Sequence, residues 1–203
     1  IRTVDLGADK YTQSREEIAH LALFAPLCGL ALRDTLHSSF GLNAEIKWPN
    51  DVLLSTQKTA GVLVEATWRG TEVAGIVLGI GINISSGSLP PHGAQLFPAT
   101  YLEEQLDHPV DRLLLLKELL NSLAKWRLEL ATPVFFQEWQ KHLAFKGQMV
   151  RIEDSKKTSI IGTVKGINSQ GNLVLSLENG SEQDFAAGDI HLRLLESQNT
   201  GGV

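Results

Sequence analysis

One stretch of the chain ends a strand abruptly and gathers polar side chains around the break. Residues 45–48 have the composition of a strand, but Pro49 cannot continue a central sheet ladder. Asn50 and Asp51 follow, and short side chains of this type hydrogen-bond their own backbone in turns. The sequence therefore predicts a sharp bend at this point, with polar groups clustered around it.

Two lysines, Lys47 and Lys58, flank this bend, and Gly61 follows shortly after. Such a cluster can hold a phosphate or a carboxylate, because the lysines neutralise the charge and Asn50 orients the group. Asp51 can help to hold a metal ion, and Gly61 lets a ligand approach the backbone closely. The same pattern is also typical of a solvated hairpin, and the spacing alone leaves both interpretations open.

The composition bounds the fold and excludes one class of function. With 203 residues, the chain exceeds the roughly 100 to 150 residues of a usual domain, which predicts one large domain with a small one. A hydrophobic content of 43% is enough for a packed core. The formal net charge of -5 argues against a nucleic-acid-binding face, which needs clustered Lys and Arg.

Further features predict a soluble, cytoplasmic protein without a membrane segment. No apolar stretch reaches the roughly 18 to 20 residues that span a bilayer, and no signal-peptide pattern opens the chain. The single cysteine, Cys28, cannot form an internal disulfide, as expected in a reducing compartment. Because the chain begins at Ile1 and its only methionine is Met149, we expect that it was processed or belongs to a longer protein.

The first half of the chain predicts a helix and a hairpin. Ser14 and Glu17 form a capping box, and apolar residues then recur at helical spacing. Pro26 is expected to bend or break this helix. Two apolar runs, residues 61–68 and 73–84, are joined by turn residues and predict an antiparallel β-hairpin.

Two glycines, Gly79 and Gly81, lie inside the second strand of this hairpin. A dinucleotide-binding fingerprint needs a third glycine and a turn from strand to helix, so the pair does not predict a Rossmann fold. Glycines inside a strand mark a bulge or a ligand that lies against the sheet. They can equally make room for a helix that packs on the sheet.

The second half predicts two helices and then a change to short strands. The helices are expected at 112–130, after Asp111, and from Pro133 to about residue 142, with Thr132 as N-cap. Four β-rich runs separated by turn residues predict a small barrel. They are residues 148–153, 159–167, 173–177 and 190–194.

Three blocks of the sequence, in order, resemble the signature of biotin protein ligases. They are Lys47-Trp48-Pro49-Asn50-Asp51, Lys58-Thr59-Ala60-Gly61-Val62-Leu63-Val64-Glu65 and Gly79-Ile80-Gly81-Ile82-Asn83. The resemblance implies an α+β fold in which a mixed or antiparallel sheet is packed by helices and is followed by a small all-β SH3-like barrel. The expected catalytic domain covers residues 1–145, the SH3-like domain covers 146–195, and 196–203 form a disordered tail.

The resemblance also implies an activity, its substrates and a partner. Members of the family use ATP, biotin and Mg²⁺ to form biotinyl-adenylate, and they transfer biotin to a lysine of the biotin carboxyl carrier protein of a carboxylase. A homodimer is one possible assembly. Lys58 is the implied principal catalytic residue, in contact with the biotin carboxylate and the α-phosphate, and Lys47 supports the phosphates.

The resemblance assigns further residues to each ligand. Biotin is expected to contact Lys58, Gly61, Leu63, Gly79 and Ile82. ATP is expected to contact Lys47, Asn50, Asp51, Lys58, Asn83 and Arg193, with Mg²⁺ at Asn50 and Asp51. The segment 85–98 is expected to fold over the adenylate, with Leu96 and Phe97 as contacts to the adenine.

The pattern of the family is incomplete in this sequence. Family members also hold biotin with a Ser-x-Asn segment, a glutamine and a Gly-Arg-Gly-Arg-x-Gly-Arg loop, and residues 1–13 contain none of these. The resemblance therefore covers about residues 14–195. Two alternatives stay open: a lipoate-type protein ligase, whose pattern lacks the Trp-Pro pair, and a truncated, non-catalytic module that binds nucleotide or the carrier protein.

Overall fold

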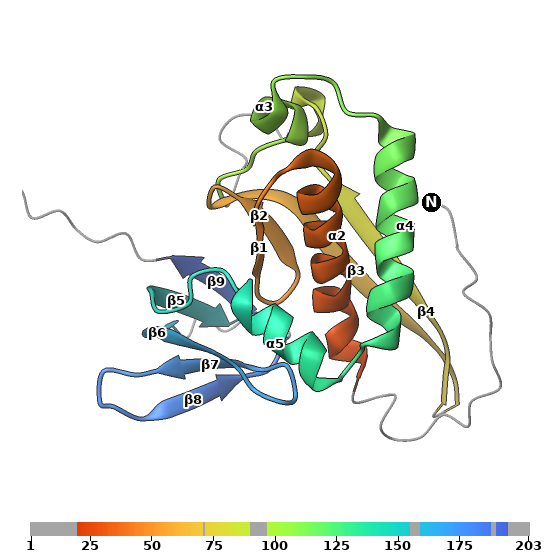
Figure 1. The fold of residues 1–203 in the computed structure, drawn as a ribbon. Coiled ribbons are helices and arrows are strands. Elements are labelled where there is room, and N and C mark those ends of the chain that lie inside the picture. Colours follow the sequence, from red (N-terminus) through yellow and green to blue (C-terminus); the bar gives the residue numbers. More distant parts are fainter. Residues whose placement is uncertain (1–19, 71, 90–96, 155–158, 188–189, 195–203) are drawn as a thin grey trace, which may run out of the picture.

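The chain folds into two antiparallel sheets packed with helices, as the computed structural model shows (Figure 1). The structure describes residues 20–70, 72–89, 97–154, 159–187 and 190–194. The first sheet has the order β1-β2-β3-β4 and the second the order β8-β7-β6-β5-β9. This arrangement confirms the predicted α+β class.

The elements of the first sheet and its helices come first in the chain. The strands are β1 (Ala44–Lys47), β2 (Asp51–Leu54), β3 (Gln57–Arg69) and β4 (Glu72–Ile82). The helices are α2 (Phe24–Phe40), α3 (Leu102–Leu106), α4 (Arg112–Leu128) and α5 (Pro133–Lys141), with short 3-10 turns η1 (Leu21–Leu23) and η2 (Ser86–Ser88). None of the helices among the described residues is long and apolar enough to cross a membrane.

The helix α2 begins and ends where local chemistry allows it. Pro26 lies in the first turn of α2, where its missing N–H costs no intrahelical bond. The helix α2 begins two residues before Pro26, directly after η1, and the part of the expected helix before residue 20 lies outside the described residues. Gly41 ends the helix in the left-handed conformation, with φ of 69°. The predicted capping box at Ser14 and Glu17 lies outside the described residues.

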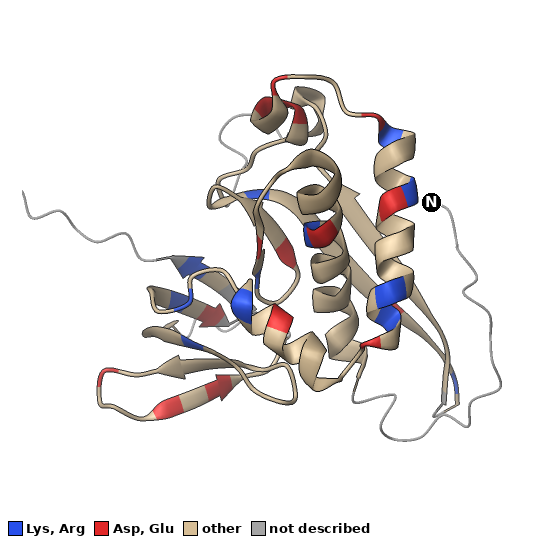
Figure 2. Ribbon diagram, viewed as in Figure 1, with Lys and Arg blue, Asp and Glu red and all other residues tan. Residues whose placement is uncertain are grey.

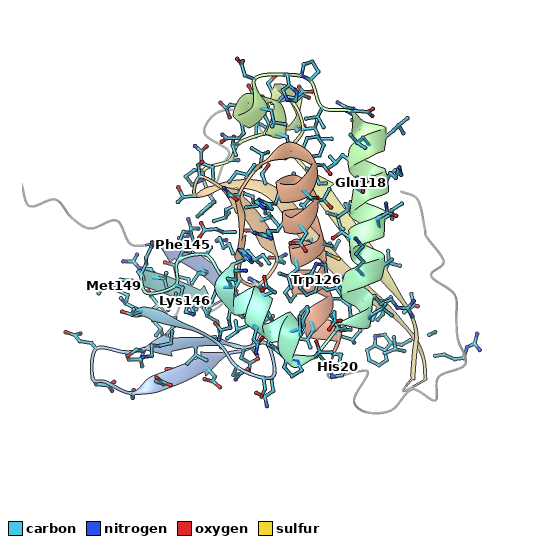
Figure 3. All side chains as sticks on the ribbon, viewed as in Figure 1. His20, Glu118, Trp126, Phe145, Lys146 and Met149 are labelled. Atoms are coloured by element: carbon cyan, nitrogen blue, oxygen red, sulfur yellow. The ribbon has the colours of Figure 1, made fainter. Side chains whose placement is uncertain are left out.

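The caps of the two later helices match the sequence. Asp111 accepts hydrogen bonds from the Leu113 and Leu114 N–H groups at the start of α4, and Thr132 accepts one from Phe135 N–H at the start of α5. Trp126 of α4 lies beside α2 (Figure 3). Its indole Nε1–H donates to Asp34 Oδ2 of α2 at 2.9 Å. This hydrogen bond joins α2 to α4.

The second sheet contains the four predicted strands and one more. Its strands are β5 (Met149–Asp154), β6 (Ser159–Ile167), β7 (Leu173–Ser176), β8 (Glu182–Phe185) and β9 (Ile190–Leu194). The sequence pattern does not predict β8, because the first three residues of this strand are polar and exposed. The predicted division of domains at residue 145 stays a prediction, and the predicted tail lies outside the described residues.

The two sheets share a continuous buried core. The chain after α5 runs beside β1, where Ile46 N–H donates to His142 O at 2.8 Å and Ala144 N–H donates to Ile46 O at 2.9 Å. Trp48 is 1% exposed, and it belongs to the same buried cluster as Leu173 and Leu175 of β7. Trp48 in the bend after β1 is therefore buried, while Pro49 and Asn50 are half-buried.

Candidate functional site

One row of paired residues crosses all four strands of the first sheet. Lys47 of β1 lies opposite Asp51 of β2, Asp51 lies opposite Gly61 of β3, and Gly61 lies opposite Gly81 of β4. Directly opposite residues in antiparallel strands project to the same face of a sheet. Two charged residues and two glycines therefore share one face, and we call them the charged row.

The carboxylate of Asp51 binds two ammonium groups. Its Oδ2 lies 2.9 Å from Lys47 Nζ, and its Oδ1 lies 2.5 Å from Lys58 Nζ. Lys47 and Asp51 are buried, with 8% and 7% of their surface exposed, whereas the side chain of Lys58 is 40% exposed. One carboxylate balances only one of the two lysines, so the cluster keeps a net positive charge, with Lys58 accessible to an anion.

A β-bulge at Thr59 turns Lys58 towards this face. Val52 pairs with Ala60, but Leu53 pairs with Lys58, so Thr59 is an extra residue in β3. In a regular strand, residues 58 and 61 would project to opposite faces, and the bulge brings them to the same face. The sequence gives no local signal for this bulge.

Gly61 provides the space that the Lys58 side chain occupies. A Cβ atom at Gly61 would lie 3.2 Å from both Cε and Nζ of Lys58, and 3.5 Å from Asp51 Oδ1. The sequence predicted that this glycine admits a ligand to the backbone. In the structure, the missing side chain admits the lysine itself.

An aromatic ring covers the buried lysine. The Nζ atom of Lys47 lies 4.8 Å from the centroid of the Phe97 ring, which is the geometry of a cation–π contact. The Phe97 ring in turn lies 6.5 Å from the Phe145 ring. Phe97 was predicted to contact adenine, and that role stays a prediction beside its observed contact with Lys47. Leu96 lies outside the described residues.

The two asparagines predicted to bind the nucleotide hold backbone segments in place. The Nδ2 of Asn50 donates to Val62 O at 2.8 Å, which ties the bend after β1 to β3. The Nδ2 of Asn83 donates to Thr100 O at 3.1 Å and to Lys58 O at 3.4 Å. Both side chains therefore fix the frame around the lysines, and their contact with a nucleotide stays a prediction.

The structure separates the residues predicted to line the biotin site. Leu63 lies opposite Gly79 on the same face as Gly61, and Leu63 is 60% exposed. Ile82 instead lies opposite Ala60 and packs against the buried core on the other face. Alternation along β4 contains this signal, because residues 79 and 82 are an odd number of positions apart.

The predicted ATP contact from the second sheet lies on β9. Arg193 is half-buried, and it pairs in register with Arg151 of β5. Its contact with a nucleotide stays a prediction.

The donor set around Asp51 does not fit a divalent cation. Both carboxylate oxygens bind ammonium groups, and the Nδ2 of Asn50 is engaged with a carbonyl. Across the part of the chain that the structure describes, no group of three or more His, Cys, Asp or Glu residues could hold a metal. The role of Asp51 in this structure is that of a counter-ion for two lysines, and its Mg²⁺ role stays a prediction that these contacts do not favour.

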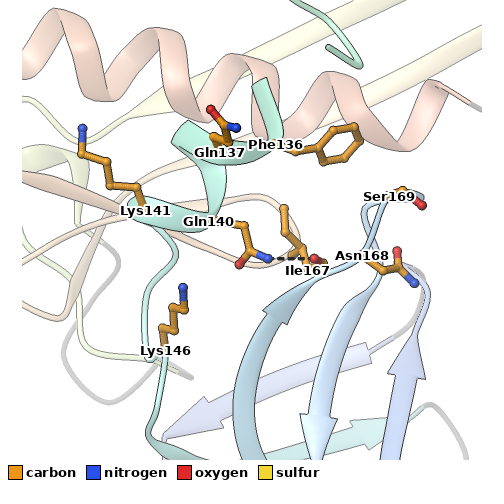
Figure 4. Close-up of a pocket in the computed structure, with 8 residues that line it drawn as sticks. All are labelled: Phe136, Gln137, Gln140, Lys141, Lys146, Ile167, Asn168 and Ser169. Atoms are coloured by element: carbon orange, nitrogen blue, oxygen red, sulfur yellow. Dashed lines mark hydrogen bonds between the residues drawn. The ribbon is translucent and has the colours of Figure 1, made fainter. Parts of the chain in front are cut away.

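Other charged residues and one groove lie elsewhere in the described part of the chain. The helix α4 carries four basic residues and one acidic residue, and both signs are present on the second sheet (Figure 2). A groove of about 490 Å³ lies between α5 and the second sheet (Figure 4). Its lining residues are Phe136, Gln137, Gln140, Lys141, Lys146, Ile167, Asn168 and Ser169. None of the residues predicted for biotin or ATP lines it.

Two family models match this chain, one over a segment that contains the first sheet and one over the second sheet. The model described as "Biotin/lipoate A/B protein ligase family" matches residues 8–83, which include the charged row. The fold and the lysine cluster thus define a protein of the biotin/lipoate ligase class. The model described as "Biotin protein ligase C terminal domain" matches residues 145–193, the SH3-like part. The chain belongs to the biotin protein ligase family.

Curated relatives agree with this family. The chain is 30% identical over 170 residues to the bifunctional ligase/repressor BirA of Escherichia coli K12, covering 83% of this chain and 52% of that protein. It is 33% identical over 158 residues to a biotin acetyl-CoA-carboxylase ligase of Paracoccus denitrificans, covering 73% and 64%. The chain therefore spans about half to two thirds of the length of these relatives.

Solved structures share the fold. The biotin protein ligase of Aquifex aeolicus superposes with a TM-score of 0.75 at 23% identity, covering 89% of this chain and 78% of that one. The same enzyme in complex with biotin and ATP gives a TM-score of 0.72, covering 88% and 72%. At this identity the likeness establishes the fold.

Proposed function

We propose that this protein is an ATP-dependent biotin ligase, which forms biotinyl-adenylate and transfers biotin to a lysine of a biotin carboxyl carrier protein. The observation that carries the proposal is the pair of lysines on one carboxylate, beside an exposed strand with two glycines. The names of the relatives and the Aquifex aeolicus complex with biotin and ATP support it.

The first step has to bring two anions together. An oxygen of the biotin carboxylate attacks the α-phosphorus of ATP, the bond to the β-phosphate oxygen breaks, and pyrophosphate leaves. Lys58 carries its positive charge on the accessible side of the cluster, where it can contact both groups. Cations placed in advance lower this barrier most where water is excluded, because the local dielectric is low.

The buried half of the cluster keeps Lys58 in place. Lys47 holds one oxygen of Asp51, and the other oxygen holds Lys58. The side-chain amides of Asn50 and Asn83 donate hydrogen bonds to backbone carbonyls, and these bonds fix the strands on which the charged groups lie. A positioned cation contributes more than a freely rotating one, because its ordering entropy has already been lost before the substrates bind.

The second step transfers the acyl group. A neutral lysine amine of the carrier protein attacks the carbonyl carbon of the mixed anhydride, AMP leaves, and the amine loses a proton as the amide forms. Biotin would lie along β3 and β4, against Gly61, Leu63 and Gly79. The exposed Leu63 would then cover an apolar part of the ligand.

The test is Lys58→Ala in the full-length protein, read out as biotin-dependent release of pyrophosphate from ATP. We expect a loss of about 100-fold or more, because a positioned transition-state cation is removed, with an unchanged circular dichroism spectrum. The control is Lys117→Ala, at a lysine of α4 whose side chain is 72% exposed, which should keep normal activity. Normal pyrophosphate release from Lys58→Ala would contradict the proposed role.

The same assay separates the alternatives. Lipoate offered in place of biotin should give no pyrophosphate, and a rate with lipoate above that with biotin would indicate a lipoate-type ligase. A wild-type protein that binds nucleotide but releases no pyrophosphate with either acid would indicate a non-catalytic module.

A further inference from the structure

The bend beside the lysines is anchored in the second sheet. Trp48 lies between β1 and β2, directly after Lys47, and its side chain is almost fully buried. Its indole Nε1–H donates to Gly171 O at 3.1 Å, across 123 residues of sequence. The carbonyl that receives this bond lies in the turn between β6 and β7.

That turn has a defined shape of its own. Asn168 Oδ1 accepts the N–H groups of Gln170 and Asn172, each at 3.0 Å, and Gly171 N–H donates to Asn168 O at 3.0 Å. A side chain that closes a turn in this way fixes the direction of the carbonyl groups within it. The turn therefore presents the Gly171 carbonyl to Trp48 in one orientation.

Gly171 fits closely against the first part of the chain. Its φ of +80° is in the left-handed region that favours glycine. A Cβ atom there would lie 2.7 Å from Leu23 Cδ2 and 3.3 Å from Trp139. Conformation and space both require a glycine at this point, so the turn between β6 and β7 packs closely against Leu23 and Trp139 while its carbonyl binds Trp48.

A second hydrogen bond joins the first part of the chain to the second sheet, away from the lysines. We call the contact between these two parts the seam. Gln140 Nε2 of α5 donates to Ile167 O of β6 at 2.8 Å (Figure 4). Beside it, a Cβ atom at Gly166 would overlap the Gln140 carboxamide. This bond joins the same two parts of the molecule as the Trp48 bond does, but Gln140 has no neighbour in sequence among the site residues.

We propose that Trp48 is a positioning residue, through which the second sheet holds the bend that sets Lys47 opposite Asp51. The inference rests on the proposed function. The strand β1 ends at Lys47 and β2 begins at Asp51, and the three-residue bend joins them. A rotation of Trp48 within this bend therefore moves both residues. Since Asp51 also binds Lys58, the displacement reaches the accessible ammonium group.

The experiment compares two variants of the full-length protein that each remove one hydrogen bond across the seam. Trp48→Phe removes the bond next to the lysines, and Gln140→Met removes the bond away from them with little change in volume. We expect Trp48→Phe to lower kcat for pyrophosphate release about 10-fold, because small misplacements of catalytic groups cost up to about 100-fold. The KM for biotin, which would bind along β3 and β4, should stay within about 2-fold. Gln140→Met should keep the wild-type kcat although its thermal midpoint falls.

Two outcomes would overturn the inference. One is a wild-type kcat for Trp48→Phe, and the other is an equal loss of kcat in both variants, which would assign the effect to general loosening of the seam. If Trp48→Phe fails to fold, Asn168→Ala loosens the same turn from the opposite side. It should lower kcat at unchanged KM, and a wild-type kcat there would equally refute the inference. A wild-type protein without pyrophosphate release would instead refute the proposed function.

Discussion

Two neighbouring rows of residues cross the first sheet and differ in almost every property. The charged row is Lys47, Asp51, Gly61 and Gly81. The adjacent apolar row, one residue away on each strand, is Ile46, Val52, Ala60 and Ile82. Because side chains alternate along a strand, the two rows project to opposite faces.

The apolar row is covered along its whole length. Ile46, Val52 and Ala60 are at most 2% exposed, and Ile82 packs against the same core. The helix α2 approaches closely enough that a Cβ at Gly29 would lie 3.3 Å from the Ile46 side chain. Burial on this face therefore supplies the stability of the sheet.

The charged row is buried at one end and open at the other. Lys47 and Asp51 are buried, and Gly81 is exposed. A buried charge has to be paired, whereas an open glycine strand has little to stabilise it. The comparison teaches that the two faces of one sheet can differ in role: one face is buried and stabilises the fold, and the other carries the proposed site. Asp51 contributes to both, because it is buried and it binds the two lysines.

The largest expected effect comes from Asp51→Ala. The substitution leaves buried Lys47 without its carboxylate and brings two ammonium groups together, which should cost about 3 kcal/mol of unfolding free energy. The exposed side chain of Lys58 adds little to this cost because water screens it. Urea denaturation measures the change.

A double variant provides the control for this prediction. Lys47→Met combined with Asp51→Leu removes both buried charges and should recover most of the lost stability. A single Asp51→Ala variant within about 1 kcal/mol of the wild type would show that this end of the charged row does not contribute as its burial indicates.

An intermediate effect is expected from a methyl group placed at the two glycines of the row. Gly61→Ala puts Cβ 3.2 Å from the Lys58 ammonium and should displace it, lowering kcat about 10-fold. Gly81→Ala meets only the Gly61 carbonyl oxygen at 3.9 Å and should leave the geometry of Lys58 unchanged. Steady-state kinetics and thermal unfolding of both variants make the comparison. Equal kcat values in the two variants would show that Gly61 does not provide space for the lysine.

The smallest effect concerns pH at the edge of the apolar row. His142, whose carbonyl accepts the Ile46 N–H, has its pKa lowered from 6.5 by burial and then by nearby positive charges. As pH falls below about 6.5, the unfolded chain takes up this proton before the folded one does, so stability is full above that pH and decreases below it. His142→Gln should flatten this part of a stability curve measured from pH 7.5 to 5. An unchanged slope would assign the pH dependence to other groups.

Local sequence chemistry determined much of the fold. The start of α4 after Asp111, the cap Thr132, the hairpin of β3 and β4 and four strands of the second sheet were predicted from residue types and spacing. The caps and the hairpin depend on contacts between residues close in sequence, and the strands were marked by β-rich runs between turn residues. The same patterns missed β8, because a polar edge strand does not alternate.

The sequence predicted which residues belong to the candidate site, but it did not predict how their side chains are placed relative to one another. The three signature blocks brought Lys47, Asp51 and Lys58 into one hypothesis, and the structure joins them in one ion cluster. The grouping of Ile82 with the glycines ignored its odd spacing from Gly79, and the structure puts it on the other face. No sequence pattern in either segment predicted the contact between Phe97 and Lys47.

The sequence by itself determined where the chain bends, where its helices are capped and which family its motifs resemble, because turns and caps are decided within a few residues. Only the tertiary structure decided which face each side chain occupies around the bulge at Thr59, and that Trp48 binds the carbonyl of Gly171. The bulge and a contact across 123 residues depend on how separate segments pack together, which the alternation within one segment does not record.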